Sequence, residues 1–132
     1  MEIHVWVSIA SERRTPEEIS AFLGLESDSS WRIGDIRKST IIKEKNHGWV
    51  LESGLPPAGA DIEAHLEALL GRLRRVSEKI RTISTEAEVT VQCIVYTTER
   101  FGFAVENWAV RMIAEMGAAL DVDVYYLPRR ID

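Results

Sequence analysis

The sequence of 132 residues contains one cysteine, Cys93, and no apolar run near the ~20 residues that a membrane-spanning helix needs. A single cysteine excludes an intrachain disulfide and any zinc site built on several thiolates. The N-terminal segment also lacks the basic stretch and apolar core of a secretory signal peptide. From these absences we expect a cytoplasmic protein without a membrane partner.

Positive charges are also fewer than negative charges. The sequence contains 16 lysines and arginines and 21 aspartates and glutamates, for a formal net charge of −5. A field of this sign repels phosphate, so we expect no nucleic-acid partner. The one basic stretch, residues 71–82, follows acidic residues along a predicted helix, and that order complements the helix dipole. A protein partner attracted by long-range charge would therefore be basic.

Recognisable catalytic and cofactor motifs are missing as well. The sequence contains no Gly-x-Ser-x-Gly, no phosphate-binding loop and no dinucleotide fingerprint. The three histidines, His4, His47 and His65, do not have the His-x-x-x-His spacing of a helical zinc site. We interpret His65 as a boundary residue of a long helix, and Cys93 as a buried, inert thiol that alternates with valines along a strand. We therefore expect no cofactor and no metal.

The first half of the chain alternates between strand and helix patterns. Residues 2–10 alternate apolar and polar side chains, as a half-buried strand does. Thr15, Pro16 and Glu18 form the start signal of a short helix, and Gly24 ends it. The next segments are predicted as a loop and two strands joined by a hairpin turn, at 25–35, 36–44 and 48–53.

The second half contains the longest helix signal. Apolar residues recur in steps of four and three over residues 61–83, which predicts one helix with Gly71 and Val76 as candidate break points. The remaining elements are predicted as a strand, a helix and a strand, at 88–98, 105–116 and 118–127. In the last helix, Trp108 falls on the apolar side, and we interpret it as core filling.

The order of these elements determines the fold class that we expect. The first six match a ferredoxin-like βαββαβ core, and an extra helix and strand follow at the C-terminal end. Amphipathic helices must cover a sheet face, and right-handed crossovers place them together on one side. We predict one α+β domain over residues 1–132, with the helices on one face of a mixed, largely antiparallel sheet.

The sheet face turned away from these helices is the candidate site. Strand alternation places a mixture of polar and aromatic side chains there, namely His4, Trp6, Gln92, Tyr96, Asp121, Asp123 and Tyr125. A tryptophan on an outer sheet face usually has a cover, which here would be a partner protein, a second subunit, a ligand or the loop at 26–36. Asp121 and Asp123 either belong to a site or solubilise a strand and discourage edge pairing.

Several stretches, taken in order, resemble the bacterial family DUF4279, a domain of unknown function. They are TPEEISAFLGL near the start, GD at Gly34 and Asp35, HGWVLES at 47–53, IEAHLEALLGRL, and EMGAALDVDVYY near the end. The resemblance implies a small cytosolic bacterial protein, and it brings no established catalytic residues. Small acidic proteins of this kind include immunity partners of toxins.

Two classes of function are compatible with these patterns. The first is a non-enzymatic protein-binding module, such as an immunity or regulatory partner, whose outer sheet face binds a basic protein or a second copy of the chain. The alternative is a small-molecule or metal-dependent enzyme that uses the same face, with Asp121 and Asp123 as acid–base or ligand groups. We predict the first, because no catalytic constellation accompanies the face.

Overall fold

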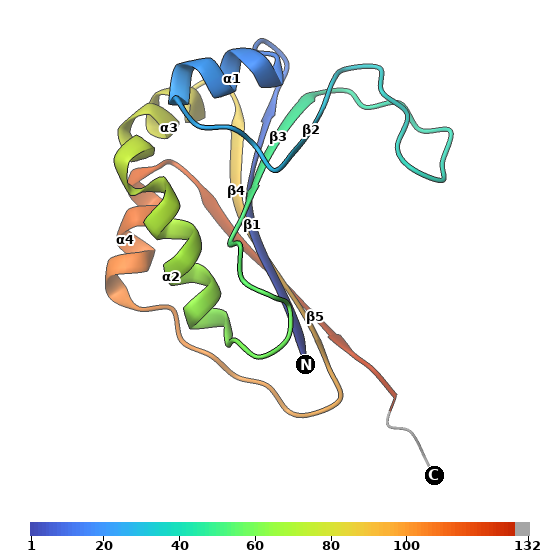
Figure 1. The fold of residues 1–132 in the computed structure, drawn as a ribbon, viewed down its shortest axis with the longest axis vertical. Helices are drawn as coiled ribbons and strands as arrows, with labels where there is room; N and C mark the ends of the chain where they lie inside the picture. Colours follow the sequence, from blue (N-terminus) through green and yellow to red (C-terminus); the bar gives the residue numbers. More distant parts are fainter. Residues whose placement is uncertain (129–132) are drawn as a thin grey trace.

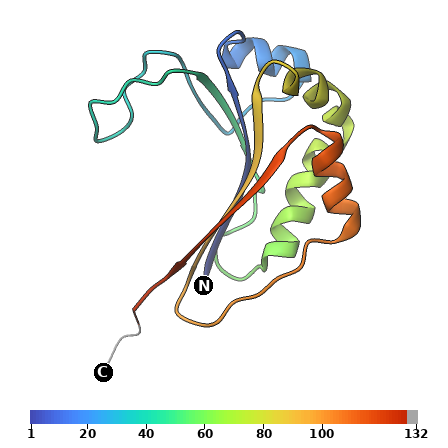
Figure 2. The same ribbon diagram turned by 180° about the vertical axis from the view of Figure 1, so that it is seen from behind.

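A computed structural model describes residues 1–128, in which helices lie on one side of a five-stranded sheet (Figure 1). The elements are β1 (Glu2–Ser11), α1 (Pro16–Leu23), β2 (Ser29–Trp31), β3 (His47–Glu52), α2 (Ile62–Leu73), the 3₁₀ turn η1 (Arg74–Val76), α3 (Ser77–Ser84), β4 (Glu88–Thr97), α4 (Asn107–Glu115) and β5 (Ala119–Tyr126). The view from behind shows the same separation of helices and strands (Figure 2). The fold class is therefore α+β, as the sequence predicts. None of the helices in residues 1–128 is long and apolar enough to cross a membrane.

The strands are ordered β2-β3-β1-β4-β5 in the sheet. β1 pairs antiparallel with β3 and β4, and β2 pairs antiparallel with β3, whereas β5 pairs parallel with β4. The sheet is thus mixed and largely antiparallel, as predicted, and α4 makes the crossover to the parallel edge strand β5. The extra C-terminal helix and strand that the sequence predicts are present as α4 and β5. The order of the five strands differs from that of a four-stranded ferredoxin-like unit, so the exact ferredoxin-like topology is not confirmed.

The hydrophobic core lies between the sheet and the helices. Buried and half-buried positions alternate along β1 and β4, and their inward side chains are mostly valine and isoleucine. Trp49 of β3 is fully buried, and its indole N–H donates a hydrogen bond of 3.0 Å to the Ser20 hydroxyl of α1. This contact joins α1 to the sheet at the centre of the core.

Cys93 of β4 is one of the fully buried core residues, which confirms the predicted burial. Burial, with a smaller contribution from the negative charge of Asp121, raises the pKa of the Cys93 thiol to about 12. A thiol with this pKa is protonated at neutral pH and is therefore a poor nucleophile. Cys93 consequently belongs to the core and not to a reactive site.

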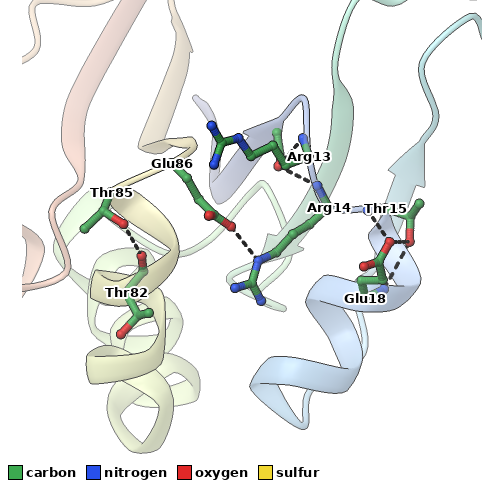
Figure 3. A network of polar contacts seen from close by, with 8 residues as sticks. Arg13, Arg14, Thr15, Glu18, Thr82, Thr85 and Glu86 are labelled. Carbon is green, nitrogen blue, oxygen red and sulfur yellow. Dashed lines mark hydrogen bonds and ion pairs between the residues drawn. The ribbon is translucent and has the colours of Figure 1, made fainter.

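Polar contacts hold the start of α1 against the segment between α3 and β4 (Figure 3). Arg14 donates a hydrogen bond of 2.6 Å from Nε to the Glu86 carboxylate, and its guanidinium lies 4.5 Å from the ring centre of Phe22. Thr15 accepts from the Glu18 backbone N–H at 3.2 Å and completes the predicted capping box. These contacts join α1 to the segment that leads from α3 into β4, at one end of the helix layer.

The strand prediction between residues 25 and 44 is wrong. Residues 36–44 contain one isolated bridge, between Ile36 and Lys43, and the strand that precedes β3 is β2, inside the segment predicted as a loop. β2 is only three residues long, so it is too short to produce a periodic pattern in the sequence.

The helix predictions are correct in position but not in every detail. The helical run that begins at Ile62 is interrupted by η1, which ends at Val76, one of the two candidate break points. Trp108 is 41% exposed, so its prediction as core filling is wrong. The physical reason is that α4 lies at the edge of the helix layer. It packs on the edge strand β5, on α2 and on α3, and no described element covers its remaining side.

Candidate functional site

The seven predicted site residues lie on the sheet face turned away from the helices, which we call the open face. Residues directly opposite one another in neighbouring strands point to the same side of a sheet. Trp6, Gln92 and Asp121 form one such row across β1, β4 and β5. Two further rows run through His4 with Asp123 and through Tyr96 with Tyr125. The structure therefore brings all seven residues onto one surface.

Three aromatic rings form a continuous band across the open face. The His4 ring meets Tyr96 edge to face, with centroids 6.1 Å apart and an interplanar angle of 87°. Tyr96 stacks on Tyr125, with centroids 5.3 Å apart and an angle of 20°. Aromatic pairs of this geometry contribute about 0.5–1.5 kcal/mol each beyond the area they bury. The band is thus a fixed surface, and its outer end is open because Tyr125 is 50% exposed.

The charged residues of the open face are all acidic. The strand register places five carboxylates on this face, at Glu2, Glu52, Glu88, Asp121 and Asp123. Gln92 donates a hydrogen bond of 3.0 Å to Asp123, and His4 lies 3.6 Å from Glu2. The five described strands contain no lysine and no arginine. The open face is consequently a negatively charged surface with an aromatic band inside it.

The loop at 26–36, a candidate cover for Trp6, places the ring of Trp31 over another part of the sheet. Trp31 pairs with Gly48 at the far end of β3, on the open face, and its indole lies directly against the glycine. A Cβ atom at Gly48 would overlap that indole, so the close approach requires glycine there. Trp6 is half-buried, and it borders a pocket at the C-terminal end of β3.

This pocket, of about 150 Å³, opens where β3 has ended and residues 53–57 run alongside β1. The Ser53 N–H donates to the Val5 carbonyl, and the Ile3 N–H donates to the Pro57 carbonyl, both at 2.9 Å. The pocket walls include Trp6, Ser53 and His65. The pocket therefore connects the open face with a polar pair, Ser53 and His65, on the helix side of the sheet.

Ser53 and His65 form that polar pair. The Ser53 hydroxyl lies 2.7 Å from Nδ1 of His65, and it also accepts the Leu55 N–H at 3.3 Å. His65 is only 1% exposed, and its Nε2 has no hydrogen-bond partner among the described residues. The prediction of His65 as a boundary residue is therefore wrong.

The sequence contained a signal for His65 but none for its partner. His65 follows Ile62 by three residues and precedes Leu69 by four, so helical periodicity alone places it on the buried stripe of α2. Ser53 lies in an aperiodic segment, where no spacing points to it. The pair could be recognised only after the fold had placed these segments together.

The Ser53–His65 pair does not amount to a catalytic triad. A serine nucleophile needs a base that a third group orients, as the carboxylate does in a Ser-His-Asp triad. Among the described residues nothing bonds to Nε2 of His65, the nitrogen that such a group would hold. Residues 1–128 also contain no group of three or more His, Cys, Asp or Glu side chains placed to hold a metal ion.

The free energy of unfolding should fall in mild acid because of His65. Burial is the main cause that lowers the pKa of His65 below its usual value of 6.5, and His4 adds to this, while the Pro56 carbonyl and Asp61 oppose it. The unfolded chain, whose histidine titrates near about 6.5, then binds the proton more readily than the folded chain. The stability contributed by neutral His65 is thus complete above pH about 6.5 and decreases as the pH falls towards its folded pKa.

Urea denaturation between pH 5 and pH 8 measures this dependence, with His65→Leu as the reference. The slope of unfolding free energy against pH should be smaller in His65→Leu than in the wild type. Equal slopes in the two proteins would show that His65 does not titrate differently in the folded and unfolded chains.

The fold and the open face define a small α+β protein that carries an acidic, aromatic surface on an uncovered sheet. The family model described as "Domain of unknown function (DUF4279)" matches residues 1–127. The chain therefore belongs to the DUF4279 family, as its sequence stretches predict. No curated protein and no solved structure matches the chain.

Proposed function

We propose that this chain is a non-enzymatic protein-binding module whose open face binds a basic surface of a partner protein. One observation carries the proposal: five carboxylates share a sheet face with an aromatic band, and the strands of that face contain no lysine or arginine. Long-range attraction of a basic partner to such a face would speed association and select against acidic proteins.

The distribution of residues on the face supports this proposal. Trp6 and Ile94 lie near its centre, on β1 and β4, and Tyr96 lies near the C-terminal end of β4; all three are half-buried. The acids lie at the N-terminal ends of β1 and β4, at the C-terminal end of β3 and on the edge strand β5. An apolar, aromatic centre inside a charged rim is the usual anatomy of a protein–protein interface. A protein with an immunity or regulatory role would use this surface to bind a basic partner.

Replacing Trp6 with alanine should weaken partner binding without unfolding the protein. A tryptophan at the centre of an interface typically contributes 2 kcal/mol or more, which corresponds to about 30-fold in Kd. The measurement is a pull-down from source-cell lysate read by mass spectrometry, followed by calorimetry on the purified pair. Trp108→Ala is a matched control, because Trp108 is exposed on α4, in the helix layer.

The result supports the proposal when the captured protein is basic, is retained by Trp108→Ala and is lost by Trp6→Ala. A partner that Trp6→Ala binds as tightly as the wild type does would exclude the open face as its binding surface. Circular dichroism and the melting temperature of each variant verify that the fold is intact.

A small-molecule site is the second candidate function, and the pocket beside Trp6 favours it. The pocket has about the volume of an engineered cavity that binds benzene, about 150 Å³, and the Ser53–His65 pair lies in its wall. A melting screen with metabolites and metal ions tests this candidate, with His65→Leu as the variant of the pocket wall and Asp123→Ala as a variant of the face outside the pocket. If no compound shifts the wild-type melting curve, the enzyme alternative loses its basis.

Several finer assignments accompany the main proposal. We propose that residues 1–132 form one domain, and that its first four strands derive from a ferredoxin-like unit. The second point is supported by their adjacency in the order β2-β3-β1-β4 with antiparallel pairing throughout. Bacterial origin and a cytoplasmic location are proposed from the family resemblance and the sequence.

A further inference from the structure

Residues 32–46, which connect β2 to β3, form a projecting segment that we call the arm. Figures 1 and 2 show the arm extending away from the rest of the chain, on the side opposite the helices. Its two halves are joined by backbone hydrogen bonds, including Glu44 N–H to the Asp35 carbonyl at 2.7 Å and Arg37 N–H to the Ile42 carbonyl at 2.9 Å. The arm thus has a defined, hairpin-like shape and not that of an unstructured loop.

The arm exposes apolar side chains that no other part of residues 1–128 covers. Its four isoleucines, Ile33, Ile36, Ile41 and Ile42, are between 46% and 93% exposed. Every other isoleucine in residues 1–128 is buried or half-buried. A cluster of exposed large apolar residues on an ordered segment marks an interaction surface.

The arm also differs in charge from the rest of the protein. It contains five basic and two acidic residues, a net charge of +3, which leaves −8 on the remainder of the chain. Arg32 pairs with Glu17 of α1, and Arg37 pairs with Glu44 inside the arm. The arm's three lysines, Lys38, Lys43 and Lys45, have no ion-pair partner within residues 1–128. The arm is therefore a basic, apolar projection from an acidic protein.

We propose that the arm of one molecule docks on the open face of a second copy, and that the second copy's arm docks on the first in return. This inference rests on the proposed function of the open face as a protein-binding surface. The arm's lysines complement the carboxylates of the face, and its isoleucines match the aromatic centre. A reciprocal exchange about a two-fold axis uses both surfaces of both molecules, so the assembly closes as a dimer.

A second copy suits the arm better than a membrane or a nucleic acid does. The arm projects on the same side of the sheet as the open face (Figure 1). An anionic lipid or phosphate surface that the arm approached would therefore also meet the carboxylates of the face, which it repels. A second copy presents an acidic face too, but it also brings a basic arm of its own, which would lie against the carboxylates of the first copy.

A charge exchange between two variants tests the dimer. The arm variant is Lys38→Glu/Lys43→Glu, and the face variant is Asp121→Lys/Asp123→Lys. The wild type should be a dimer by sedimentation velocity in low salt, and each variant alone should be monomeric, with a dimer Kd raised on the order of 100-fold by like-charge contacts. An equimolar mixture should form a heterodimer, because the reversed arm meets the reversed face and the unchanged arm meets the unchanged face.

The control is Arg75→Glu/Lys79→Glu, which makes the same change in charge at exposed positions of η1 and α3, in the helix layer, and should leave the dimer intact. A wild type that is monomeric at all concentrations would overturn the inference, as would a dimer that survives both variants or a mixture that stays monomeric. Failure here is separate from failure of the proposed function. The arm variant keeps an unchanged open face and should still capture a basic partner protein.

Discussion

Replacing Trp49 with alanine should lower the free energy of unfolding by about 3–5 kcal/mol, the cost typical of removing a large buried aromatic side chain. Trp49 is completely buried in β3, and its indole N–H bonds to Ser20 on α1. The substitution leaves a cavity between that helix and the sheet, and it also removes the partner of a buried hydroxyl. Since proteins of this size are stable by about 5–15 kcal/mol, the variant should retain only part of the wild-type stability.

Urea denaturation followed by tryptophan fluorescence and circular dichroism measures this loss. Trp49→Phe is the informative companion, because it removes the hydrogen bond and part of the ring system but keeps a large apolar side chain, and it should cost less than Trp49→Ala. Trp108→Ala is the surface control, and it should cost much less because the side chain is 41% exposed. If Trp49→Ala and Trp108→Ala lost equal stability, the packing of α1 on β3 would be incorrect.

The second large effect concerns the buried pair of Ser53 and His65. Ser53→Ala should cost about 1–3 kcal/mol, because it leaves both ring nitrogens of a buried histidine without a partner. The double variant Ser53→Ala/His65→Leu should recover part of that loss. Removing both partners eliminates the unsatisfied polar atoms, and leucine fills much of the space of the imidazole.

A double-mutant cycle measured by urea denaturation at pH 7.5 reports this coupling. The expected result is non-additive, with the double variant more stable than Ser53→Ala alone. Recovery should be incomplete, because the Leu55 N–H also bonds to the Ser53 hydroxyl. Strictly additive losses would mean that the 2.7 Å contact contributes nothing to stability.

The parts of the fold that could be predicted from the sequence are those with a strong local period. The alternation along residues 2–10 and 88–98 predicts both central strands and assigns their two faces correctly. The capping box of Thr15 and Glu18 predicts the start of α1. In each case neighbouring residues carry the information, so no knowledge of distant contacts is required.

The parts that could not be predicted depend on contacts between distant segments. β2 exists because three residues pair with β3, and the whole arm separates these two strands in the sequence. Ile36 and Ile41 suggest a buried strand, yet both are exposed in the part of the chain that the structure describes. Trp108 has the spacing of a core residue, but its helix lies over the sheet's edge. Hydrophobic spacing identifies a face of an element and not what lies against it.

The side of the sheet on which the seven candidate residues lie could be predicted from the sequence, whereas their use as a site stays a prediction. All seven outer-face residues were assigned by strand alternation alone, because a period of two fixes the side on which each residue lies. The rows that join Trp6 to Asp121 and Tyr96 to Tyr125 required the strand order, which alternation does not contain. The pocket with Ser53 and His65 lies where β3 gives way to a loop, and no repeat marks that point.

The position of β5 has a consequence for the protein during synthesis. β1, β3 and β4 are complete once residue 97 has been made, whereas Asp121, Asp123 and Tyr125 emerge from the ribosome with the final strand. Chains fold as they are made, at about 5–20 residues per second, so we expect the part of the open face on β1, β3 and β4 to form before the part on β5. The face therefore acquires two of its five carboxylates, and the outer ring of its aromatic band, only after β5 has been made, which delays recognition of a partner until the strands around them are in place.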